Sequence, residues 1–343
     1  MSAEIRVDAA QEARTIPMLS SERRAGESSR RNKRWGMILA GGDGTRLRSL
    51  TRFISGDDRP KQFCPLLDDH TLLAHTVRRA GLSICTRQIL FALTRAHREF
   101  YSRELDDFRR NWIVQPANKG TAPPIAFSVL SIEQIDRDAL IAIIPSDHCY
   151  SEDARLTDAL ESAFEIAAKR PESVVLLGAS PERLEVEYGW IELGAHVGES
   201  DGHVHSVFRF WEKPSIEIAL TLLDCGAVWN TFVMVGHVRA FWEILARTIP
   251  KVMEEMRHAR LWTGSERHVY ERVYDRLPPT DFSSHVLAKT TDLLLALQAR
   301  NLGWSDLGSP ERVLAAVEKQ SLKPRWFTAW MQADESGRPE FGG

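Results

Sequence analysis

Short apolar segments alternate with amphipathic segments from residue 35 onward, and this alternation constrains the fold more than any other feature. Five runs of strand length, rich in aliphatic residues, lie at 36–40, 88–93, 112–114, 140–144 and 173–177. Runs of this kind are typical of strands that are buried on both faces of a sheet. Because helical patterns separate them, the sequence predicts an α/β fold, Rossmann-like and doubly wound, around a mostly parallel sheet.

The segments between these runs carry helix signals. The clearest predicted helix follows Ser151, which we expect to be its N-cap, and ends before Pro171. Asp153 lies in its first turn, where the helix dipole favours an acid. One apolar stripe runs along this helix through Leu156, Leu160, Ala163, Phe164 and Ala167. Residues 71–80 and 121–135 are predicted helices as well.

Composition changes near residue 35 and suggests how the chain is divided. Residues 1–34 are rich in Ser, Glu and Arg and contain few large apolar side chains. Such a segment cannot offset its ordering entropy, so we expect a disordered N-terminal extension. Residues 35–315 form the expected folded domain, and residues 316–343 the expected C-terminal tail.

Charge and cysteine content exclude several classes of protein. The formal net charge of the 343 residues is -3, which offers no electrostatic support for nucleic-acid binding. The four cysteines form no CxxC pair, so neither a zinc site nor a disulfide framework is indicated. No apolar run reaches the roughly 18 to 20 residues of a membrane span, and the run after the basic residues 30–34 is too short for a signal peptide. We therefore expect a cytoplasmic protein with no membrane partner.

A glycine-rich loop, LAGGDGTRL at residues 39–47, follows the first predicted strand. Gly41, Gly42 and Gly44 allow the backbone to approach a ligand and to point its amide groups at anionic oxygens. The loop lacks the GK[ST] ending of a Walker A motif, and Leu47 stands where the dinucleotide fingerprint has its third glycine. Taken alone, the loop is equally compatible with a tight turn.

Polar or turn-forming residues follow three of the predicted strands. They are the glycine loop, Gln115-Pro116 and the segment 145–148, Pro-Ser-Asp-His. In open α/β sheets, ligands bind beyond the carboxyl ends of the strands. These segments are therefore expected to meet in one ligand site.

The string LAGGDGTRLRSLTRFISGDDRPKQF at 39–63 resembles the signature of the sugar nucleotidyltransferase family, most of all its mannose-1-phosphate guanylyltransferase branch. Five further segments resemble motifs of that branch in the same order: NKGTAP at 118–123, PSDH at 145–148, EYGWIE at 187–192, EKP at 212–214 and WSDLGS at 304–309. The resemblance covers roughly residues 35–315. It implies an enzyme with the nucleotide-diphospho-sugar transferase type of fold, and makes 35–315 its catalytic domain.

The reaction implied by the resemblance joins a nucleoside triphosphate to a sugar 1-phosphate and releases pyrophosphate. An oxygen of the sugar phosphate attacks the α-phosphorus, and since this oxygen is already anionic no general base is needed. The chemical difficulty is to bring two polyanions together. We therefore expect catalysis by positioning and charge neutralisation.

The resemblance assigns a role to each motif. The expected nucleotide-binding residues are Gly41, Gly42, Gly44, Thr45, Gln115, Gly120 and Thr121. Arg46 and Lys61 are expected to hold the triphosphate and pyrophosphate, and Lys213 the phosphate of the sugar. Asp147 and Asp306 are expected to bind one Mg²⁺, whose preference is for hard oxygen ligands. The expected sugar-binding residues are Glu187, Gly189, Glu192 and Asn230.

Single residues of this set also have structural interpretations. Asp147 is compatible with a helix-capping turn, and Lys213 with an exposed surface lysine. His148 beside Asp147 is the kind of ligand that a softer metal prefers, but nothing near it in sequence completes such a ligand set.

One position departs from the family pattern. Asn230-Thr231-Phe232 stands where the family usually has Asn-Ser-Gly, so Phe232 replaces a glycine beside the sugar. GTP and mannose 1-phosphate are the favoured substrates, but another pair of NTP and sugar 1-phosphate stays open. A non-catalytic nucleotide-sugar-binding relative is the second alternative, disfavoured because the expected metal and phosphate ligands are all present. A homodimer stays open, and a second activity such as an isomerase is not expected, because no β-helix or cupin-like domain follows.

Overall fold

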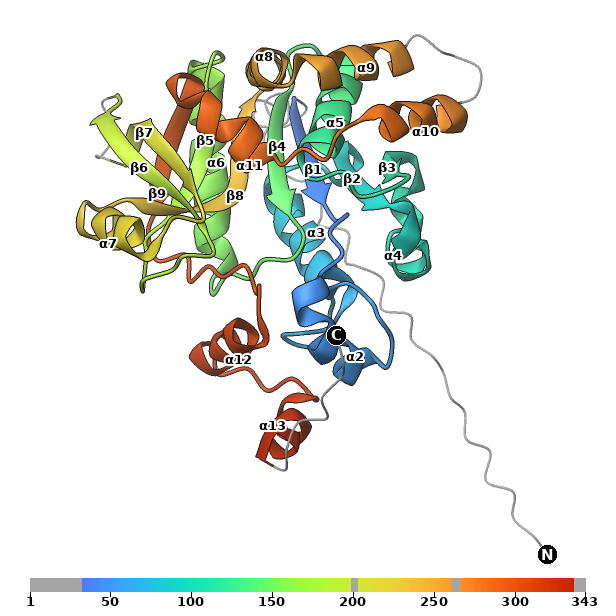
Figure 1. Ribbon diagram of the computed structural model, residues 1–343, viewed down its shortest axis with the longest axis vertical. Coiled ribbons are helices and arrows are strands. Elements are labelled where there is room, and N and C mark those ends of the chain that lie inside the picture. The colour runs from blue at the N-terminus through green and yellow to red at the C-terminus, as the bar shows by residue number, and fades with distance from the viewer. Residues whose placement is uncertain (1–32, 199–202, 261–265, 336–343) are drawn as a thin grey trace, which may run out of the picture.

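The protein is described by a computed structural model that covers residues 33–198, 203–260 and 266–335. Almost all of the predicted N-terminal extension lies outside these residues. A nine-stranded sheet forms the centre of the described structure, in the order β3-β2-β1-β4-β8-β5-β9-β7-β6 (Figure 1). Its strands are β1 (Arg34–Leu39), β2 (Ile89–Thr94), β3 (Trp112–Gln115), β4 (Leu140–Pro145), β5 (Val174–Ala179), β6 (Gly189–His196), β7 (Val204–Glu212), β8 (Val228–His237) and β9 (Leu294–Ala299).

The helices pack on both faces of this sheet and at one end of it. They are α2 (Arg48–Ser55), α3 (Leu72–Ser83), α4 (Arg98–Glu104), α5 (Ala122–Ile135), α6 (Asp153–Lys169), α7 (Ile216–Asp224), α8 (Val238–Thr248), α9 (Pro250–Arg260), α10 (Glu266–Arg276), α11 (Phe282–His285), α12 (Pro310–Lys319) and α13 (Phe327–Glu335). In the described ranges, no helix combines the length and the apolar character needed to cross a membrane.

Strands and helices are combined as predicted, but the sheet is mixed rather than mostly parallel, so the predicted Rossmann-like fold is confirmed only in part. Strands β1 to β4 pair in parallel, as do β5 and β9. Strand β8 runs antiparallel to β4, β5 and β6, while β7 runs antiparallel to β6 and β9. The sequence analysis predicted none of β6 to β9. Strands β6 and β7 are only partly buried and therefore lack a continuous apolar run, whereas β8 and β9 are almost fully buried and were missed despite their apolar residues.

The five predicted strands are confirmed to within two residues at each end. The predicted helices are confirmed as α3, α5 and α6, and the Thr71 hydroxyl caps α3 by accepting the Ala74 N–H. The prediction that Ser151 caps α6 is wrong, because the helix begins at Asp153 with Glu152 in the N-cap position. The Ser151 hydroxyl instead donates to the carbonyl of Leu302, which ties the start of this segment to the loop after β9.

Alternating strand residues build two separate cores. In β1, Met37 faces a core shared with α5, α8 and α9, while Ile38 faces a core shared with α3 and α6. Strand β4 alternates in the same way, with Ile143 in the first core and Ile144 in the second. Because both faces are covered, β1 and β4 read as nearly continuous apolar runs.

A third core joins the two ends of the described chain. Leu50 of α2 packs with Val317 of α12 and with Trp326, whose indole N–H donates to the Leu66 carbonyl over 3.1 Å. Figure 1 shows α12 and α13 beside α2, below the sheet. The expected boundary at residue 315 falls inside α12, so residues 316–335 continue the folded domain.

Candidate active site

A cavity of about 390 Å³ opens where β1, β3 and β4 end. This size is ordinary for a small-molecule site. The predicted site residues that line it are Gly41, Gly42, Gln115, Gly120, Thr121, Asp147, Glu187, Gly189, Asn230 and Asp306. The segments after the strands therefore meet at one cavity, as the sequence predicted.

The glycine loop is held by side chains from three other segments. The amide of Gln62, in the 3-10 helix η2 (Lys61–Phe63), donates to the carbonyls of Ala40 and Gly42. Asp43 accepts the Asn118 amide over 2.9 Å and lies 3.2 Å from Nε2 of His97. These contacts restrain the conformation of the loop.

Gly41 is needed for close packing behind this loop. A Cβ atom at this position would lie 2.8 Å from Nε2 of Gln115 and 2.9 Å from the hydroxyl oxygen of Thr94. Gln115 is only 3 % exposed, and its side-chain carbonyl accepts the hydroxyl of Tyr274 over 3.3 Å. Any larger residue at 41 would displace a cavity-lining amide.

Lys61 joins the loops that carry the two candidate metal ligands. Its ammonium lies 3.2 Å from Oδ2 of Asp147 and donates to the backbone carbonyls of Asp306 and Leu307 over 2.5 and 3.3 Å. An ammonium has three protons to donate. Lys61, 8 % exposed, therefore has all its donors engaged with protein groups and does not line the cavity.

Asp306 is the centre of a buried hydrogen-bond network. Its carboxylate accepts the Tyr188 hydroxyl, the Gly308 N–H and two contacts of 3.0 and 3.1 Å from Arg312. Burial acts to raise the pKa of Asp306, but the positive charges of Lys61 and Arg312 and the hydrogen bond from the Gly308 N–H hold that pKa below its usual range. Arg312 is in turn anchored by Glu185 at 2.9 Å.

His148 is engaged in the protein interior. Its Nδ1 lies 3.2 Å from the indole nitrogen of Trp304, and burial lowers the pKa of the imidazole. A ring nitrogen that accepts an indole N–H has no lone pair left for a metal on that side. His148 therefore supports Trp304 at the cavity wall.

The backbone around the opposite wall is unusual. Phe232 lines the cavity with φ of 58°, in the left-handed region that favours glycine, and its N–H donates to the Asn230 side chain over 3.1 Å. Lys213 and Leu307, next to the lining residues Glu212 and Asp306, have φ of 48° each. Backbone strain of this kind concentrates at functional sites.

Thr121 and Asp281 connect the base of the cavity to α11. The Thr121 hydroxyl donates to the Asp281 carboxylate over 3.1 Å and accepts the Phe282 N–H over 2.7 Å. Gly120 fits here because its φ is 87° and a Cβ would lie 2.4 Å from the Thr280 carbonyl. The NKGTAP motif therefore positions a second segment, distant in the sequence, at the cavity.

Some predicted site residues lie outside the cavity lining. They are Gly44, Thr45, Arg46, Lys61, Glu192 and Lys213. Arg46 is exposed and reaches the cavity indirectly, through an ion pair of 3.2 Å with Glu187. Glu192 accepts the indole N–H of Trp211 on the neighbouring strand, so its carboxylate is engaged away from the cavity.

Several cavity residues had no role in the sequence prediction. They are Tyr188, Glu212, Asp281, Ser283 and Trp304. Tyr188, Glu212 and Trp304 lie inside the recognised motifs, so the motifs were the signal for them. Asp281 and Arg312 carry no local signal, since only the folded chain brings them to the site.

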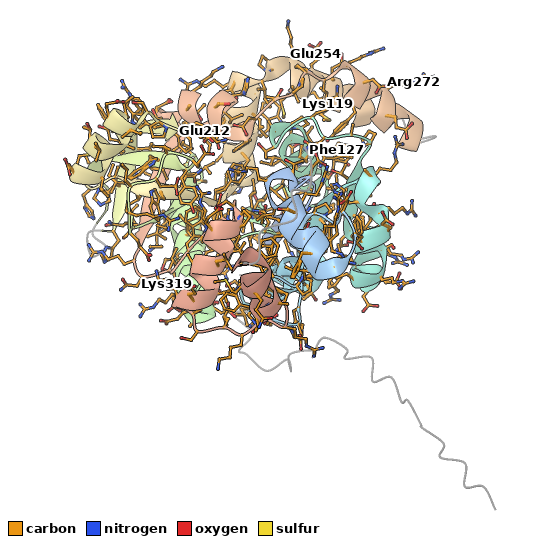
Figure 2. All side chains as sticks on the ribbon, turned by 60° about the horizontal axis from the view of Figure 1, so that its bottom comes forward. Lys119, Phe127, Glu212, Glu254, Arg272 and Lys319 are labelled. Carbon is orange, nitrogen blue, oxygen red and sulfur yellow. The ribbon has the colours of Figure 1, made fainter. Side chains whose placement is uncertain are left out.

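Figure 2 shows Glu212 and Lys119 in the upper half of its view, far from Lys319 of α12.

The chain matches known proteins over most of its length. A family model described as nucleotidyl transferase matches residues 35–321. The xanthan biosynthesis protein XanB of Xanthomonas campestris is 29% identical over 297 residues, which is 82% of this chain. The mannose-1-phosphate guanylyltransferase ManC of Salmonella typhimurium is 28% identical over 294 residues, again 82% of this chain.

A solved structure shares the fold. It is described as mannose-1-phosphate geranyltransferase from Thermus thermophilus, with a TM-score of 0.71, 28% identity and coverage of 82% of this chain and 79% of that one. The matched part spans 59% and 58% of the lengths of XanB and ManC, so those relatives are considerably longer than the matched region. The predicted resemblance is confirmed at the level of the family: the chain belongs to the nucleotidyl transferases.

Proposed function

We propose that this chain transfers a guanylyl group from GTP to mannose 1-phosphate, giving GDP-mannose and pyrophosphate. The observation that carries the proposal is the meeting of Asp147 and Asp306 at one cavity, which the glycine loop also lines. The names of the ManC relative and of the Thermus structure support mannose 1-phosphate as the sugar substrate, and ManC supports GTP.

The donor set fits a magnesium ion. Asp147 and Asp306 offer carboxylate oxygens from two loops, and His148, the nearby soft ligand, is engaged with Trp304. Hard oxygen donors without a free imidazole suit Mg²⁺ rather than a transition metal. Bound there, the ion would neutralise negative charge on the reacting phosphates.

The residues of the chain supply position and charge. Lys61 contacts the loops of Asp147 and Asp306 and so holds them side by side. Arg312 orients the Asp306 carboxylate. The backbone N–H groups of the glycine loop donate hydrogen bonds to phosphate oxygens. The carboxylates of Glu187 and Glu212 accept hydrogen bonds from hydroxyl groups of the sugar. Since the attacking phosphate oxygen is already anionic, no residue has to remove a proton.

The proposal is tested by pyrophosphate release from the purified chain with Mg²⁺, crossing the four NTPs with mannose, glucose and N-acetylglucosamine 1-phosphates. We expect release with GTP and mannose 1-phosphate. Asp147→Asn and Asp306→Asn should each lower turnover by about 100-fold or more, because charge stabilisation is the main catalytic contribution. Lys319→Met, in an exposed pair with Glu182, is the matched control and should leave turnover unchanged.

Each other outcome has a definite meaning. Release with a different pair keeps the reaction class and corrects the substrates. Near-normal turnover in both aspartate variants would exclude them as metal ligands. No release from folded protein, with nucleotide sugar still bound, would favour the non-catalytic relative.

A further inference from the structure

Two histidines and a carboxylate cluster in the loop before α3 and in its first turn, and none of them lines the cavity. Oδ1 of Asp68 lies 2.9 Å from Nε2 of His75 and 3.5 Å from Nδ1 of His70. One ligand atom from each residue lies within 4.8 Å of the others. Metal–ligand bonds of about 2.0–2.2 Å place the ligand atoms of tetrahedral zinc roughly 3.3 Å apart. Asp68 therefore already lies at about this spacing from both imidazoles, and the two imidazoles lie within 4.8 Å of each other.

Neighbouring groups restrain the backbone of this cluster and the ring of His75. Leu67, before the cluster, is buried in the third core, and Thr71 within it caps α3. Asp69, between the two loop ligands, pairs with Arg325 at 3.0 Å. The side chain of His75 is only 13 % exposed, so its ring has little freedom to turn away. A ligand such as His75, held in this way, loses little entropy when a metal binds.

The donor set selects a different cation from the candidate active site. Two imidazoles and one carboxylate suit zinc and related first-row divalent ions, whereas Mg²⁺ prefers oxygen ligands alone. Above about pH 7 an ordinary imidazole is mostly neutral and has a lone pair for the metal.

We propose that Asp68, His70 and His75 form a zinc-type cation site that stabilises the fold, with water completing the coordination. Asp68 and His70 belong to the loop, and His75 belongs to α3. A bound ion would cross-link these two elements beside the segment that holds Trp326. Because the ligands come together only in the folded chain, binding should raise the stability.

The test is calorimetric titration of Zn²⁺ into chelator-stripped full-length protein, with excess Mg²⁺ present to occupy the oxygen-rich site. We expect one Zn²⁺ per chain. His70→Ala and Asp68→Asn should each weaken this binding at least tenfold, since the loss of an outer-shell partner alone costs about 10- to 100-fold. Replacement by Co²⁺ should give the visible absorption of a tetrahedral centre that contains nitrogen ligands.

Matched variants separate this site from other binding. Asp147→Asn/Asp306→Asn should retain Zn²⁺ binding, as should His196→Ala, which removes an exposed histidine of β6. The Zn²⁺-dependent rise in melting temperature should vanish in His70→Ala, whose side chain is 64 % exposed and whose loss should not prevent folding. Absence of stoichiometric binding, or affinity unchanged in His70→Ala and Asp68→Asn, would overturn the proposal. No arm of the test uses transferase activity, so its result is independent of the proposed function.

Discussion

Phe232 combines a strained backbone with a packed side chain at the cavity wall. Its φ of 58° is unfavourable for any residue with a Cβ, by roughly 1–2 kcal/mol. The ring packs against the first core, which β1 shares with α5, α8 and α9. It meets Phe282 edge-on, with 6.2 Å between ring centroids. We infer that ring packing offsets the backbone strain. A glycine here would adopt the same turn without that strain.

Comparing glycine with alanine at this position isolates the strain. Phe232→Ala and Phe232→Gly lose the same ring, but only the glycine variant relieves the backbone. We expect Phe232→Gly to be the more stable of the two by about 1 kcal/mol in urea unfolding, although glycine is normally the weaker residue in a strand. At Val233, which has no positive φ, alanine should be the more stable replacement, and the same order at 232 would disprove the strain.

At the scale of elements, η2 acts as a clamp on the glycine loop. Gln62 is 2 % exposed and satisfies two carbonyls of the loop, while its neighbour Lys61 joins the loops of the candidate metal ligands. One short 3-10 helix thus fixes both the glycine loop and the loops of Asp147 and Asp306 at the cavity. The PKQF motif at 60–63 therefore contacts the glycine loop directly in the folded chain.

Gln62→Leu tests the clamp, since it keeps the volume and removes both donors. Leaving two buried carbonyls without a partner should lower the free energy of unfolding by about 1–3 kcal/mol. The KM for the nucleotide should rise about tenfold, which corresponds to about 1.4 kcal/mol of lost binding. The exposed Gln134→Leu on α5 should change neither quantity, and an unchanged nucleotide KM in Gln62→Leu would argue against the clamp.

At the scale of the whole molecule, α12 and α13 close the structure against α2. Trp326 buries its ring in the third core, so Trp326→Ala should lower the free energy of unfolding by about 3–5 kcal/mol. Arg325→Ala, which breaks only an exposed ion pair, should cost less than about 1 kcal/mol. Chemical denaturation of both variants checks this prediction. Equal losses of unfolding free energy would show that burial of the Trp326 ring does not stabilise this segment.

The link between α3 and α6 should make stability depend on pH. Asp153 accepts Nε of Arg79 over 2.6 Å and also pairs with Arg78. Burial acts to raise the pKa of Asp153, but the two arginines lower that pKa below its ordinary value. The Asp153 carboxyl therefore binds a proton more readily in the unfolded chain than in the folded one. The stabilisation from its ion pairs is present above about pH 4 and is lost as the pH falls through the pKa of the folded state.

The corresponding experiment compares the wild type with Asp153→Asn by denaturant unfolding between about pH 7 and pH 3, a range that spans the ordinary carboxyl pKa. We expect the wild type to be more stable by about 1–3 kcal/mol at the upper end of this range. The difference should shrink steadily below about pH 4, and a difference independent of pH would contradict the ion-pair explanation.

The sequence by itself determined the first half of the sheet and several of the segments that line the cavity. The apolar runs of β1 and β4 are readable because both of their faces are buried, and the motifs after them meet because parallel strands end at the same edge. Only the tertiary structure decided the direction of β8 and the partners of Lys61. Partly buried strands such as β6 lack a continuous apolar pattern, and the contact between Lys61 and the Asp306 loop joins groups 245 residues apart. Such pairings follow from the packing of the whole chain, which no local pattern encodes.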